Sequence, residues 1–113
     1  MSTATPKEEK LLEVYHTGEL TVVGFAGRRI LDRVRFDVYR DQLSELVRRH
    51  DARVLAIDLA GLEMVPSAMI GVLVSLSKLV PRIEIHNASD GVRNVFSVMK
   101  LDQKFHVQPA QPD

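Results

Sequence analysis

The chain has 113 residues, enough for one domain with its own hydrophobic core. Basic and acidic side chains number 15 each, so the formal net charge of zero gives no general attraction to nucleic acid or an anionic membrane. The sequence contains no cysteine, which excludes disulfides, thiolate metal sites and cysteine nucleophiles. The N-terminus shows no signal-peptide pattern, and the most apolar segment, 69–80, is too short to span a bilayer, so we expect a cytoplasmic protein.

The first elements along the chain are predicted to be two strands. Residues 1–10 are expected to be a disordered lead-in, because nothing there can be buried. The segments 11–16 and 19–25 are rich in residues that favour strands, and Thr17-Gly18 between them is typical of a turn. We therefore expect a β-hairpin.

A change of hydrophobic period follows the hairpin. From 34 to 50 the apolar residues recur at steps of three and four, which predicts an amphipathic helix. Asp32 is the expected N-cap, because a carboxylate can accept hydrogen bonds from the first free amides. The nearly continuous apolar run at 53–59 then predicts a central strand covered on both faces.

The second half of the chain alternates helices and strands. The pattern predicts a helix from Pro66-Ser67 to about Val80, a strand at 82–86, a short helix at 92–99, a strand at 105–107 and a tail at 109–113. The order of elements implies right-handed parallel crossovers after the hairpin. We expect one α/β domain, residues 11–108, with a mixed sheet of four to five strands and helices packed on it.

Catalytic chemistry has little support in the sequence. The four histidines stand alone, none in a metal-ligand spacing, and are expected to be surface or structural residues: His16, His50, His86 and His106. No G-x-S-x-G motif surrounds a serine, and no paired carboxylates lie in a setting that would raise a pKa. We expect no catalytic residue, no metal and no cofactor, and therefore no enzyme activity.

The arginines do not predict a nucleic-acid surface. They are interleaved with acidic residues, and no exposed aromatic side chain among them could stack on a base. A solvated surface is the preferred interpretation, so neither nucleic acid nor a membrane is an expected partner.

The most informative stretch is 54–74, an apolar strand, a short loop and a helix that begins near Ser67. Asp58-Leu59-Ala60-Gly61 matches a D-L-S-G motif, and Ser67, Ile70, Gly71 and Leu73 match D-S-[ST]-G-L-G-x-L. In these motifs the chain resembles the STAS domain family, the fold of bacterial anti-sigma-factor antagonists that also occurs in sulfate transporters.

Further matches extend the resemblance to roughly residues 11–107. They include Gly27, the strand and loop at 85–87, and a C-terminal pattern from Val95 to Phe105. The chain departs from the family pattern before and after the serine, where Pro66 replaces an aspartate, Ala68 a hydroxyl residue and Met69 a glycine. Loss of the aspartate before the serine is expected to weaken recognition by a kinase.

The resemblance implies a partner-switching regulator. In such antagonists the unphosphorylated serine form binds an anti-sigma factor that is a histidine-kinase-like serine kinase, and phosphorylation of the serine breaks the complex. Ser67 is the position that matches the phosphorylated serine. The expected docking surface lies around it: Met64, Val65, Pro66, Ser67, Ala68, Met69, Gly71, Val72 and Ser75.

Two alternatives stay open at this point. Ser67 could act only as an N-cap of its helix, with Pro66 at the helix start. The altered residues around it would also suit a STAS scaffold without phosphorylation, or an accessory subunit of a transport system. The oligomeric state, the sigma factor and the pathway are not determined by the sequence.

Overall fold

A computed structural model of the protein describes residues 10–110. Its elements, in chain order, are β1 (Leu12–His16), β2 (Leu20–Phe25), a 3-10 turn η1 (Ala26–Arg28), α1 (Phe36–His50), β3 (Val54–Asp58), α2 (Ser67–Leu76), β4 (Arg82–Ala88), α3 (Asp90–Val98) and β5 (Val107–Pro109). The expected lead-in, apart from Lys10, and the end of the expected tail lie outside the described residues. The predicted order of strands and helices is confirmed.

The five strands form one mixed sheet in the order β1-β2-β3-β4-β5. β1 pairs with β2 in antiparallel fashion, and every later pairing is parallel. Thr17 and Gly18 make the hairpin turn, where Gly18 has a φ of 131° and the Thr21 hydroxyl donates to the Gly18 carbonyl at 2.9 Å. The predicted α/β fold with a mixed sheet is therefore confirmed.

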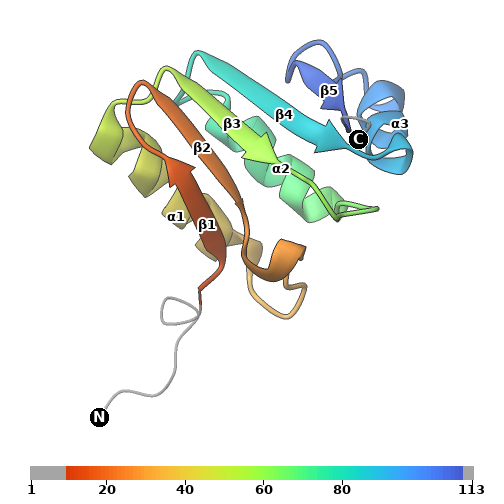
Figure 1. Ribbon diagram of the computed structural model, residues 1–113, viewed down its shortest axis with the longest axis horizontal. Helices are drawn as coiled ribbons and strands as arrows, with labels where there is room; N and C mark the ends of the chain where they lie inside the picture. Colours follow the sequence, from red (N-terminus) through yellow and green to blue (C-terminus); the bar gives the residue numbers. More distant parts are fainter. Residues whose placement is uncertain (1–9, 111–113) are drawn as a thin grey trace.

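All three helices lie on one face of the sheet. Each parallel crossover moves one strand along the sheet in the same direction, and right-handed crossovers of that kind place their helices on the same side. Figure 1 looks onto the opposite face, with α1 and α2 behind the strands and α3 beside β5. The sequence predicts that the strand at 53–59 is covered on both faces; the described helices cover only the far face, although Ala56 on the near face is also buried.

The core lies between the helices and the far face of the sheet. Alternation along the central strand turns Leu55, Ile57 and Leu59 toward the helices, where all three are buried. Tyr39 of α1 is fully buried, and its hydroxyl accepts a hydrogen bond from the Leu31 amide at 2.8 Å. At the other end of the sheet, the rings of Phe96 and Phe105 meet edge to face.

Several predicted boundaries differ from the structure. Asp32 is not an N-cap, because α1 begins at Phe36 after an extended Arg35. The second helix ends at Leu76 instead of about Val80. There the Ser77 hydroxyl donates to the Val74 carbonyl at 2.6 Å, an interaction that competes with helix continuation.

The last strand also lies later than predicted, at Val107–Pro109. Phe105 is a core residue of the preceding turn, so its apolar character reflects packing and does not mark a strand.

Candidate functional site

The predicted site begins where β3 ends and the chain crosses toward α2. The Asp58 side chain is held between two neighbours, since its Oδ1 accepts from the Ala60 amide and from Nδ2 of Asn87, each at 2.9 Å. The Leu59 amide donates to the His86 carbonyl at 2.9 Å. These bonds fix the start of the β3–α2 loop against the end of β4.

The second half of the same loop is tied to the start of α3. The Ser89 hydroxyl donates to the Glu63 carbonyl at 2.9 Å and accepts from the Val92 amide at 3.2 Å, so it anchors the loop and caps α3 together. Gly61 adopts a φ of 85°, and a Cβ at this position would lie 3.0 Å from the Arg28 side chain. The left-handed conformation therefore favours glycine there, and any other side chain would also push the Arg28 side chain aside.

Ser67 is the first residue of α2. The preceding Pro66 occupies the N-cap position in an extended conformation, and its carbonyl accepts from the amides of Met69 and Ile70 at 2.9 and 3.3 Å. The Ser67 side chain is exposed, and within residues 10–110 its hydroxyl makes no hydrogen bond. The alternative in which Ser67 serves as the N-cap is therefore wrong: Pro66 holds that place, and the serine hydroxyl is left to solvent.

The predicted docking residues separate into an exposed set and a buried set. Val65, Met69 and Val72 are 7%, 1% and 6% exposed, so a partner cannot reach them without unfolding the segment. For Met69 and Val72 the helical period explains this, because positions four residues before the core residues Leu73 and Leu76 face the sheet; Val65 is buried in the loop before α2. The remaining predicted residues are reachable, and we call them the α2 surface: Met64, Pro66, Ser67, Ala68, Gly71 and Ser75.

The α2 surface reaches farther than the sequence indicated. Met64 is 60% exposed and lies against the first turn of α3, where a Cβ on Gly91 would be 3.2 Å from its Sδ atom. Gly91 was not a predicted site residue. The hydrogen bond from Ser89 to the Glu63 carbonyl helps to hold it beside Met64, and no local sequence pattern reports that contact.

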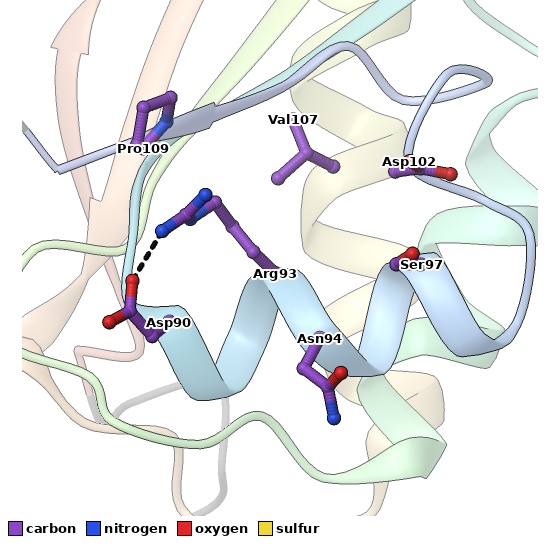
Figure 2. A pocket seen from close by; sticks show the side chains of 7 residues that line it. All are labelled: Asp90, Arg93, Asn94, Ser97, Asp102, Val107 and Pro109. Carbon is purple, nitrogen blue, oxygen red and sulfur yellow. Dashed lines mark hydrogen bonds and ion pairs between the residues drawn. The ribbon is translucent and has the colours of Figure 1, made fainter.

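Two hollows of the described surface lie outside the α2 surface. One of about 420 Å³ lies between α3 and β5 and contains none of the predicted site residues (Figure 2). Arg93 is directed toward Asp90, with which it forms an ion pair. A second, of about 460 Å³, is lined by residues 60–63 of the loop, with Asn87, Ser89 and Ala110.

Comparison with known families adds an independent finding. The family model described as "Mlab, STAS domain" matches residues 12–109. The chain belongs to the STAS domain family. No curated protein matches it.

The STAS motif residues now have structural roles. Asp58 holds the loop in place through Ala60 and Asn87, and Gly61 provides the left-handed turn. Gly71 differs from these, because it is exposed in the middle of α2 and a Cβ there would meet no atom within 4 Å. Nothing inside the STAS domain requires a glycine at that position.

The histidines of the STAS domain do not converge. Among the described residues His86 contacts Glu84, with 2.8 Å between Nε2 and Oε1, as part of a ladder on β4. Arg82 contacts the other oxygen of the same carboxylate at 2.7 Å. These two hydrogen bonds, first that of His86, hold the pKa of Glu84 below its ordinary value of 4.5. Within residues 10–110, no group of three or more histidine or acidic side chains could hold a metal ion, and no helix is long and apolar enough to cross a membrane.

Proposed function

We propose that this STAS domain is a partner-switching regulator that resembles the bacterial anti-sigma-factor antagonists. Through the α2 surface it binds a histidine-kinase-like serine kinase that acts as an anti-sigma factor, and phosphorylation of Ser67 by that kinase releases it. The kinase activity belongs to the partner, and the STAS domain itself is non-catalytic and cytoplasmic. The observation that supports the proposal best is the unbonded, exposed hydroxyl of Ser67 in the first turn of α2.

Gly71 supports docking at the same surface. A glycine inside a helix costs about 1 kcal/mol relative to alanine. Internal packing does not explain that cost here, since the space above the Cα is open. A partner whose backbone approaches the helix closely would explain it, because glycine is the residue that permits such an approach.

The domain can accept a phosphate on Ser67 without unfolding. The N-terminal end of a helix carries free amides and a partial positive charge, both favourable to an anion. The first turn of α2 contains no acidic residue that would repel the phosphate. We therefore expect phosphorylation to leave the fold intact, and to change only what the surface can bind.

The effect on the partner follows from desolvation. The phosphate brings about −1.5 to −2 charges to a surface that offers no basic residue in the first turn of α2. A partner that covers Ser67 would then bury a charge without a counter-ion, which costs several kcal/mol. One modification is thus sufficient to disrupt the complex.

Mass spectrometry of the intact protein tests the switch. The tagged domain is used to capture binding proteins from the source cell, the captured kinase is purified, and the two are incubated with ATP. We expect the domain to gain the mass of one phosphate and then to dissociate from the kinase. The Ser67→Ala variant should bind the kinase and gain nothing. A phosphate on another residue, or release without a phosphate, would contradict the proposal.

A second candidate function is a permanent scaffold, or an accessory subunit of a transport system. Pro66 and Ala68 favour it, because they replace the polar neighbours that the serine has in the antagonist motif. Such a scaffold would keep its partner in the same experiment and show no mass gain with ATP. The two functions share the α2 surface and differ only in the use of the Ser67 hydroxyl.

A further inference from the structure

A polar groove runs between α1 and α2 on the outer side of the helix layer. Its volume is about 430 Å³, and it is lined by Arg40, Asp41, Ser44, Glu45, Arg48, Ser75, Lys78 and Leu79. The walls come from one side of α1 and from the end of α2 with the turn after it.

Both acidic residues of the groove form ion pairs, whereas two of its basic residues do not. Asp41 pairs with Arg40 at 3.6 Å, and Glu45 pairs with Arg49, outside the groove, at 3.0 Å. Arg48 on α1 and Lys78 in the turn after α2 line the same groove, and neither forms an ion pair with any residue of 10–110. Both are exposed. Two uncompensated positive charges therefore lie across the groove from one another.

The groove also continues the α2 surface. Ser67, Gly71 and Ser75 follow one another at four-residue steps on the exposed side of α2, and Ser75 is itself a wall of the groove. At 1.5 Å per residue, Ser75 lies about 12 Å along the helix from Ser67. A protein that covers Ser67 and Gly71 reaches the groove by extending along the same helix.

We infer that the groove binds an acidic segment of the partner protein, with a carboxylate of that segment between Arg48 and Lys78. This inference rests on the proposed function and adds a second point of contact to it. The carboxylates of Asp41 and Glu45 in the walls favour a segment with sparse negative charges over a nucleic acid, whose phosphates would meet them at close spacing. The segment steers the partner onto α2, whereas Ser67 controls its release.

Peptide titration tests the groove without the partner. A short peptide with two glutamates separated by glycine and serine is added to the ¹⁵N-labelled domain at low salt, and the same peptide with lysine in place of each glutamate serves as the control ligand. We expect saturable shifts of the amide signals at Ser44, Arg48, Ser75 and Lys78 with the first peptide only, weakening as salt is added. Arg48→Gln/Lys78→Gln should weaken binding by at least about five-fold, since two surface charges are lost.

A matched variant separates groove binding from general attraction. Lys100→Gln/Lys104→Gln removes the same charge from the exposed turn after α3, and should leave the titration unchanged. Ser67→Asp should also leave it unchanged, because so short a peptide does not need Ser67; failure of the switch would therefore not alter this result. Shifts spread over other arginines, shifts equal for both peptides, or no saturable shift would overturn the inference.

Discussion

Two exposed surfaces of this STAS domain differ in how far their polar groups bind one another. The exposed side of β4 carries Arg82, Glu84 and His86, whose charged and polar groups bind one another. The α2 surface carries small side chains and a free hydroxyl, and at Gly71 not even a Cβ. On β4 the Glu84 carboxylate already binds Arg82 and His86, so this surface does not need a partner protein to pair its charges. The second gains little for the isolated domain, and so is the better candidate for a partner.

The largest expected effect is a loss of affinity for the kinase when the α2 surface is given a negative charge. Ser67→Asp should lower the affinity for the captured kinase by about 100-fold, because the partner would bury an unpaired carboxylate. The free energy of unfolding should hold or rise slightly, since an acid suits the start of a helix. Surface plasmon resonance and urea unfolding measure the two quantities.

The matched control for this charge is Thr17→Asp, an exposed position in the β1–β2 turn. It should change neither binding nor stability by much. Equal loss of binding in the two variants would show that net charge, and not the α2 surface, governs the interaction.

Gly71→Ala should move stability and binding in opposite directions. The alanine should raise the free energy of unfolding by about 1 kcal/mol, because it favours the helix and its Cβ points into open space. The same Cβ should weaken capture of the kinase, by about ten-fold if it holds the two backbones apart. A variant that is more stable and binds equally well would remove Gly71 from the proposed contact.

The smallest expected effect belongs to the β4 ladder, and appears in the pH dependence of stability. The pKa of Glu84 is lowered on folding, so its contribution is present above the unfolded pKa and is lost as pH falls through the folded one. Urea unfolding should therefore show a shallower loss of stability below about pH 4 in Glu84→Gln than in the wild type. Glu84→Gln should bind the kinase at neutral pH as well as the wild type does. A large binding defect would show that the exposed side of β4 also contacts the partner.

The sequence by itself determined most of the fold and the position of Ser67. Alternation and helical period report burial on one element at a time, so they identified the strands and the helices, and the resemblance to the STAS motifs singled out Ser67. The sequence also placed Ser67 at a helix start, because the fixed φ of Pro66 and its missing amide hydrogen are compatible with the start of a helix but not with its interior. The N-cap at Asp32 failed since cap selection depends on where the chain turns in space.

Only the tertiary structure decided which residues of the site are reachable. Met69 and Val72 look like contact residues beside Ser67 in the sequence, yet packing of α2 on the sheet buries both. The contact of Met64 with the start of α3 and the groove between α1 and α2 join residues 27 or more positions apart. Such contacts depend on the crossing of elements, which a local periodicity does not encode.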